Sequence, residues 1–179
     1  MILFADSVHP QHQTRLAYGW IRRGERCGIP MTAKQYRLSF MGAYELEEHK
    51  LVYKEVEKVN AKEIKAFLEQ IRDCYEASPR IHLIWDNAGY HRSKEVQAWA
   101  KELRIELHYL PAYSPNLNPI ERLWKVMHEQ VTYNKYYEKF NEFCDATRNF
   151  FKNIIFYKTS LQSRINDNFH VLSKPNFAF

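Results

Sequence analysis

Residues 61–109 alternate between helix-like and strand-like patterns, and this alternation constrains the fold more than any other feature of the chain. Apolar residues recur at three- and four-residue spacing in the helical stretches, whereas the strand-like stretches are short and apolar or alternating. The expected elements are a helix from Ala61 to Glu76 capped by Asn60, a strand over 81–85, a helix from Ser93 to Leu103, and a strand from Ile105 to Tyr109. Strands joined through helices in this way form parallel crossover units.

The first 56 residues predict strands of a different kind, because they contain short alternating runs joined by turns. The expected strands are residues 1–5, Leu16 to Arg22, Tyr36 to Tyr44, and Lys50 to Val56. Three or four antiparallel strands would then join the parallel units in one sheet. The sequence therefore predicts an α/β fold, with a mixed five-stranded sheet and helices on both of its faces.

The second half of the chain predicts a rigid loop followed by helices. Residues 111–119 contain three of the seven prolines, and a helix is expected from Pro119 to about Val131. Another helix is expected from about Tyr137 to Ile155. We expect one domain over residues 1–157, followed by a polar C-terminal tail over 158–179 that can dock on a partner.

Three acidic residues stand at positions where a site can form. Asp6 and Asp86 each follow an apolar, strand-like run, and Glu121 lies just inside the helix that follows the proline loop. Functional groups of α/β sheets gather at the carboxyl ends of central strands, so neighbouring strands would bring the two aspartates together. Three carboxylates suit two hard divalent cations and therefore phosphoryl transfer.

Each acid also has a purely structural interpretation. Asp6 can simply end a strand, Asp86 can form an Asx turn with Asn87, and Glu121 can belong to a capping box with Asn118 at the N-cap. We favour the metal role because a carboxylate at the end of a buried strand needs a compensating charge. The helix N-terminus also favours the ionised form of Glu121, as a metal ligand requires.

The overall charge favours a polyanionic partner. The net charge is +5 and the pI is about 9.0, which indicates DNA or RNA ahead of a membrane surface. Three dispersed cysteines form neither a disulfide framework nor a zinc pair, so a reducing cytoplasm is expected. No run reaches the roughly 18 apolar residues of a membrane span, and the N-terminus lacks the features of a secretory signal.

Several basic residues are candidate DNA contacts, with a solvated surface as the alternative for each. His91 can contact the scissile phosphate, orient the metal site or cap the next helix. The full set is His91, Arg92, Arg122, Lys125, Arg22 and Arg23. Trp124 lies on the apolar stripe of its helix and is expected to be a core residue. The His9 and His12 pair has a zinc-like spacing, but with no cysteine nearby a zinc site there is not favoured.

Two stretches resemble the catalytic core of bacterial insertion-sequence transposases of the mariner-like superfamily. They are Trp85-Asp-Asn-Ala-Gly-Tyr-His91 and Leu110-Pro-Ala-Tyr-Ser-Pro-Asn-Leu-Asn-Pro-Ile-Glu-Arg-Leu-Trp124. The resemblance implies a ribonuclease H-like fold, with Asp6, Asp86 and Glu121 as the Asp-Asp-Glu metal ligands for two Mg²⁺ ions, which Mn²⁺ can replace. The first acid of this family is often followed by Glu, whereas Ser7 follows Asp6 here.

The resemblance also implies an activity and its setting. It implies metal-dependent phosphodiester hydrolysis and strand transfer at the ends of a mobile element, by a homodimer assembled on DNA in the bacterial cytoplasm, associated with the nucleoid. Family members carry an N-terminal helix-turn-helix region, which is expected to be absent because this sequence begins five residues before Asp6. The alternatives are a ribonuclease H-like nuclease without strand transfer and an inactive, DNA-binding relic.

Overall fold

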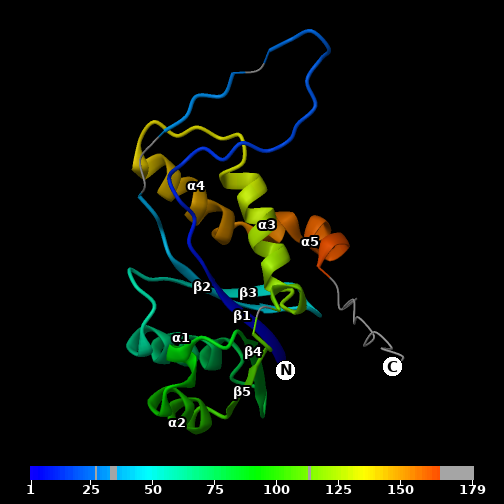
Figure 1. Cartoon of the computed structure of the whole chain (residues 1–179). Coiled ribbons are helices and arrows are strands. Elements are labelled where there is room, and N and C mark those ends of the chain that lie inside the picture. The colour runs from blue at the N-terminus through cyan, green and yellow to red at the C-terminus, as the bar shows by residue number, and fades with distance from the viewer. Residues whose placement is uncertain (27, 33–35, 113, 166–179) are drawn as a thin grey trace, which may run out of the picture.

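A five-stranded sheet forms the centre of the molecule in the computed structural model, which describes residues 1–26, 28–32, 36–112 and 114–165 (Figure 1). The strands lie in the order β3-β2-β1-β4-β5. Their bounds are β1 Ile2–Val8, β2 Phe40–Glu45, β3 Lys50–Glu55, β4 Ile81–Trp85 and β5 Ile105–Tyr109. β1 pairs antiparallel with β2 and parallel with β4, so the predicted mixed sheet is confirmed.

Helices cover both faces of the sheet, as the sequence predicts. α1 and α2 lie against one face, and α3, α4 and α5 lie on the other side (Figure 1). Their bounds are α1 Ala61–Cys74, α2 Lys94–Glu102, α3 Ile120–Val131, α4 Phe140–Lys152 and α5 Lys158–Arg164. Because strand side chains alternate between faces, Leu3 and Ala5 join the core under α1 and α2, and Val8 joins the core under α3 and α4.

The starts of α1 and α2 follow the capping rules. The side chain of Asn60 accepts a hydrogen bond from the Glu63 N–H at the start of α1, at 3.0 Å. Ser93 accepts one from the Val96 N–H at the start of α2, at 3.3 Å. Both helices therefore begin where an oxygen-bearing side chain satisfies an otherwise unpaired backbone donor.

The strand predicted from Leu16 to Arg22 does not exist. These residues adopt no helix or strand, and their large side chains are exposed, with Tyr18 at 109% and Trp20 at 104%. The physical reason lies in the sheet: β1 and β2 already pair with each other and with β4 and β3, so neither offers a free edge nearby. The segment instead forms a loop that projects beyond α3 and α4 (Figure 1).

Other predicted boundaries also shift. β1 continues to Val8, so Asp6 lies inside the strand and not after it. β2 begins at Phe40, four residues after the predicted start, and the preceding residues form only a single bridge between Arg37 and Gln11. Among the described residues, no helix combines the length and apolar character that crossing a bilayer requires.

The start of the predicted C-terminal tail folds onto the domain. α5 packs against α3, with Leu161 and Ile165 buried in the core that α3 and α4 share. The Arg164 guanidinium binds both carboxylate oxygens of Glu129 on α3, at 2.5 and 2.7 Å. Residues 166–179 of the predicted tail lie outside the described residues.

Candidate active site

Asp6 and Asp86 are brought together by the pairing of β1 with β4. The last register pair of these parallel strands is Phe4 with Ile84, and each aspartate follows two residues later. Because strand side chains repeat every two residues, Asp6 continues the face that carries Phe4, the face covered by α3. The two carboxylates therefore lie at the same end of neighbouring central strands, as the sequence predicts.

Glu121 reaches the same place from the first turn of α3. The loop before this helix is tied to the sheet by Asn118, whose side-chain N–H donates to the backbone carbonyl of Ala5 at 3.0 Å. Ala5 directly precedes Asp6, so the contact fixes the start of α3 beside the first aspartate. Asn118 is 4% exposed and makes no cap for α3, so the capping-box interpretation of Glu121 is wrong.

All three acids line one cavity of ≈ 360 Å³. Its remaining wall comes from the segment after β4 and from the proline-rich loop between β5 and α3. These lining residues are Asn87, Ala88, Leu110, Pro111, Ala112, Ser114, Pro115 and Asn118. Backbone-rigid prolines thus shape one side of a cavity whose other side carries three carboxylates.

Burial and neighbouring negative charge raise the pKa values of Asp6 and Glu121. Burial, followed by the charge of Glu121, raises the pKa of Asp6 from 3.8 to about 7, and Asp86 adds to the rise. Burial also raises the pKa of Glu121, a hydrogen bond with Asp6 lowers it, and the charge of Asp86 raises it. Full ionisation of the cluster is therefore unfavourable without a positive charge among the carboxylates, which is the environment that suits a hard divalent cation.

Trp124, also on α3, holds Asp6 through a hydrogen bond. The indole Nε1–H donates to Asp6 Oδ2 at 3.0 Å, and the ring lies on Gly42 of β2, the residue that pairs with Asp6. A Cβ at Gly42 would meet the indole at 2.5 Å, so this strand position needs glycine for the close approach of the ring. Trp124 is a core residue, as predicted, but it also orients a site carboxylate.

His91 orients Asp86. His91 Nδ1 lies 2.7 Å from Asp86 Oδ1, and its ring stacks on Trp85 with centroids 3.9 Å apart. This hydrogen bond is the main cause that lowers the pKa of Asp86. The Ala88 N–H also donates to Oδ1, at 3.2 Å, so the predicted Asx turn coexists with the site. Within the described ranges Asp86 Oδ2 accepts no hydrogen bond, which leaves it for a ligand.

The other predicted DNA contacts divide into two groups. Arg92 lies over the Tyr109 ring at 5.4 Å, one residue after His91, and Arg122 and Lys125 lie on α3 beside Glu121. Arg22 and Arg23 lie in the exposed loop, whose base at Arg15 bridges to Tyr133 beyond the far end of α3 (Figure 1). A helix of this length spans about 18 Å, so these two arginines are remote from the acids.

Sequence reasoning missed the roles of Asn118 and Trp124. Trp124 follows Glu121 by three residues, so the two lie on neighbouring positions of one helix face. That spacing could have indicated an indole donor beside the acids. The His9 and His12 pair forms no metal group in the described part of the chain: His9 Nδ1 lies 3.0 Å from Ser39 Oγ, and His12 Nε2 lies 2.9 Å from the Tyr137 carbonyl oxygen.

The chain is similar in sequence to two curated proteins of mobile elements. The chain is 24% identical over 154 residues to the insertion element IS630 uncharacterized 39 kDa protein of Shigella sonnei, covering 86% of this chain and 45% of the relative. It is 39% identical over 46 residues to the Tcb2 transposase of Caenorhabditis briggsae, covering 26% of this chain and 17% of the relative. The chain thus spans less than half the length of these curated relatives.

Solved structures share the fold. The Mos1 transposase paired-end complex with the left transposon end matches with a TM-score of 0.64 at 16% identity, over 91% of this chain and 52% of that one. The Mos1 catalytic domain matches with a TM-score of 0.59 at 14% identity, over 91% and 78%. The sequence profile of the DDE superfamily endonucleases matches residues 1–144. The chain belongs to the DDE superfamily of endonucleases, as its two motifs predict.

Proposed function

We propose that the chain is the catalytic domain of an insertion-sequence transposase, which hydrolyses phosphodiester bonds at element ends and joins the freed ends to a target. The observation that carries the proposal is the convergence of Asp6, Asp86 and Glu121, from two central strands and one helix, on a single cavity. The insertion-element relative and the transposase neighbours support the same activity. Catalysis by a bare carboxylate cluster next to a polyanion requires cations.

The three carboxylates would hold two Mg²⁺ ions, with Mn²⁺ as a substitute. Mos1 complexes are described with both metals, and the all-oxygen donor set of this site suits them. When bound, two such ions supply an activated water or 3′-hydroxyl and stabilise the leaving 3′-oxygen.

The chain's own residues position this chemistry. Trp124 fixes Asp6 through Oδ2, and His91 fixes Asp86 through Oδ1, so both carboxylates are oriented before metal or DNA arrives. Asn118 keeps α3, and with it Glu121, against β1. Because the acids come from separate elements, these tethers set the spacing between the ligands.

DNA would approach along the start of α3 and the segment after β4. Arg92, Arg122 and Lys125 lie on these elements, and positive side chains there can neutralise phosphates beside the cavity. The exposed loop with Arg22 and Arg23 projects away from the acids and would contact more distant DNA or a second subunit. We propose a homodimer on DNA, in the bacterial cytoplasm and associated with the nucleoid.

Nicking of supercoiled plasmid tests the proposal. The wild-type chain should nick in the presence of Mg²⁺ or Mn²⁺, and a chelator should abolish nicking. Asp86→Asn should be inactive, whereas Asp73→Asn, which alters an exposed aspartate near the end of α1, should match the wild type. Nicking that survives in Asp86→Asn would overturn the assignment of the site.

A second assay separates a transposase from a simple nuclease. A labelled oligonucleotide with an element end and a free 3′-hydroxyl is incubated with plasmid, the chain and Mn²⁺. Covalent joining of the label to the plasmid supports strand transfer. Nicking without joining would favour the hydrolytic nuclease, and neither activity in a folded protein would favour the inactive relic.

A further inference from the structure

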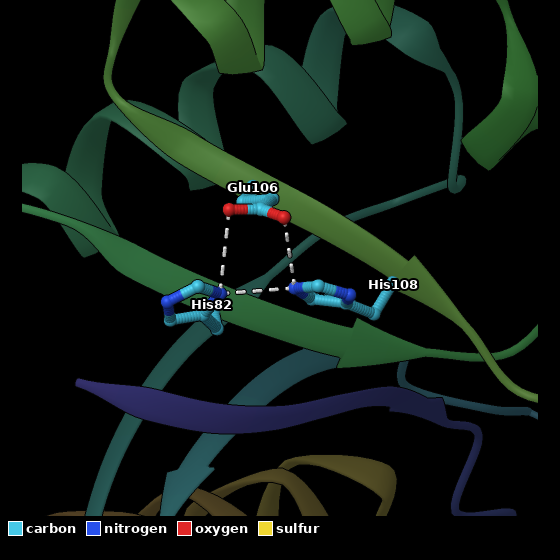
Figure 2. A group of neighbouring side chains, drawn as sticks. All are labelled: His82, Glu106 and His108. Carbon is cyan, nitrogen blue, oxygen red and sulfur yellow. Dashed lines mark hydrogen bonds and ion pairs between the residues drawn. The ribbon is translucent and has the colours of Figure 1, made fainter.

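A second group of metal-ligating side chains lies on the sheet, separate from the acid cluster. It consists of His82 on β4 and Glu106 and His108 on β5, and Figure 2 shows the three side chains facing one another. The core under α3 and α4 includes no residue of these two strands. All three side chains are part-exposed, at 35%, 49% and 42%, so an ion in solution can reach them.

The register of the two strands brings these residues together. β4 and β5 are parallel, His82 pairs with Glu106, and Ile84 pairs with His108. The intervening pair, Leu83 with Leu107, points to the opposite face, toward the core under α1 and α2. Alternation along β5 therefore puts Glu106 and His108 on one face, next to the His82 ring.

The ligating atoms lie close enough together to share one ion after small adjustments. His82 Nδ1 lies 3.0 Å from His108 Nε2, a hydrogen bond that an ion would replace, and the two Glu106 oxygens lie 3.6 Å from His82 Nδ1 and 3.8 Å from His108 Nε2. Tetrahedral Zn²⁺ with bonds of about 2.0–2.1 Å separates its ligand atoms by about 3.4 Å. The Glu106 carboxylate thus faces both rings at distances too long for hydrogen bonds but suitable for a shared ion.

We propose that His82, Glu106 and His108 bind one divalent transition-metal ion of the Zn²⁺ type, with water completing the coordination. Two imidazoles and one carboxylate favour Zn²⁺, Ni²⁺ or Cu²⁺ over Mg²⁺, which prefers oxygen ligands. The acid cluster offers only oxygen atoms from carboxylates. The chain would therefore carry two metal centres that select different ions by the chemistry of their ligands.

The ion would stabilise the pairing of the edge strand β5 with β4. β5 pairs only with β4, so its other side has no strand partner within the described segments. An ion held by one β4 residue and two β5 residues adds a cross-link between the two strands and contributes to folded-state stability. The site is thus structural in character, and nothing in its position requires it to touch DNA.

Arg80 provides a way to tune the site without removing a ligand. Its Nη1 lies 3.6 Å from Glu106 Oε2, and its side chain is 69% exposed. The guanidinium competes with an ion for the same carboxylate, although its exposure lets it swing away at little cost. Replacing Arg80 by Gln should therefore tighten metal binding. A variant that only disturbed the fold would weaken metal binding instead.

Competition between the chain and a chromophoric chelator for Zn²⁺, in excess Mg²⁺, tests the proposal. One Zn²⁺ should bind per chain, His108→Gln and Glu106→Gln should each weaken binding at least about tenfold, and Arg80→Gln should strengthen it. Asp86→Asn and His9→Gln are matched controls, one in the acid cluster and one at a remote exposed histidine, and both should bind like the wild type. Zn²⁺ should also raise the Tm of the wild type but not of His108→Gln.

Three outcomes would overturn the proposal. They are the absence of stoichiometric Zn²⁺ binding, binding unaffected by both His108→Gln and Glu106→Gln, and binding lost in Asp86→Asn, which would put the ion in the acid cluster. Circular dichroism of each variant separates lost binding from lost structure. If one ligand variant fails to fold, the other decides, because Glu106 is exposed and its replacement by Gln preserves shape.

Discussion

The acid cluster and the histidine-containing cluster use neighbouring strands of one sheet in opposite ways. The acids come from β1, from the segment after β4 and from α3, and they are oriented by Trp124, His91 and Asn118. His82, Glu106 and His108 come from two adjacent strands and lie open to solvent. The comparison teaches that the acid cluster needs orienting side chains from several elements, whereas the register of two strands alone can bring a group of metal-ligating side chains together.

The largest expected effect is the loss of nicking when a cluster acid is replaced. Asp86→Asn removes the charge of a ligand and should lower the nicking rate at least about 10³-fold. Replacement of a ligand in the other cluster, His108→Gln, should leave the rate within about twofold. Gel quantification of nicked plasmid measures both variants. A large loss in His108→Gln would break the distinction between the two clusters.

A smaller effect is expected when the indole donor is removed. Trp124→Phe retains an aromatic ring against Gly42 but deletes the Nε1–H that holds Asp6. The nicking rate should fall roughly 10–100-fold, the usual cost of losing a group that orients a metal ligand. The Mg²⁺ concentration for half-maximal activity should rise, and a titration of Mg²⁺ at fixed DNA measures this. An unchanged requirement for Mg²⁺ would mean that Trp124 acts only in packing.

The metal-free protein should become less stable as the pH rises. The folded-state pKa of Asp6 is about 7, above the ordinary value of 3.8, so the folded state binds the extra proton between these values. The contribution of the Asp6 carboxyl to the free energy of unfolding is therefore fully present below about pH 4, and it is lost as the pH rises through 7. Asp6→Asn should remove most of this slope and raise the Tm at pH 8 by at least about 3 °C, although it abolishes nicking.

Thermal melts in chelator across this pH range measure the slope, with Asp73→Asn as the matched control. The Glu121 carboxyl, whose pKa is also raised, should leave a residual slope of the same sign. A melt that is flat with pH in the wild type would contradict the electrostatic description of the cluster. Mg²⁺ should reduce the slope, because a cation favours the ionised acids.

The smallest expected effect is the stabilisation by Zn²⁺ at the second cluster. An ion at ten times its Kd adds about 1.4 kcal/mol, which corresponds to a Tm rise of roughly 3–6 °C in a domain of this size. The same addition to His82→Gln should give no rise. Differential scanning calorimetry in excess Mg²⁺ makes the measurement, and an equal rise in both proteins would remove the contrast between the clusters.

The acid site was predictable because each acid carries a local signal. Asp6 and Asp86 follow apolar runs, and Glu121 follows a proline loop at a helix start, so the sequence indicates each position, and the pairing of β1 with β4 brings the two aspartates together. The second cluster was not predictable, because it depends on the pairing of His82 with Glu106 across β4 and β5. Both strands were expected, but their relative register is a tertiary property that a single sequence does not display.

The error at residues 16–22 has the same origin. The run has strand-like composition, but strand formation needs a free partner edge, and β1 and β2, the strands before and after it in the chain, are already paired on both sides. The local sequence pattern indicates which secondary structure a segment can form. Whether the segment becomes a strand depends on a free strand edge with which it can pair. The hydrogen bond from Trp124 to Asp6 likewise joins residues 118 positions apart in the sequence.

The exposed loop has a practical consequence for handling the isolated chain. Tyr18 and Trp20 are fully solvated, and Leu16, Ile21 and Met31 are each more than half exposed on the same segment. Covering an exposed apolar side chain lowers the free energy, so these residues favour contact with any surface that removes them from water. Solubility should therefore be set by this loop rather than by the net charge of +5, and it should worsen with salt that screens the repulsion between copies.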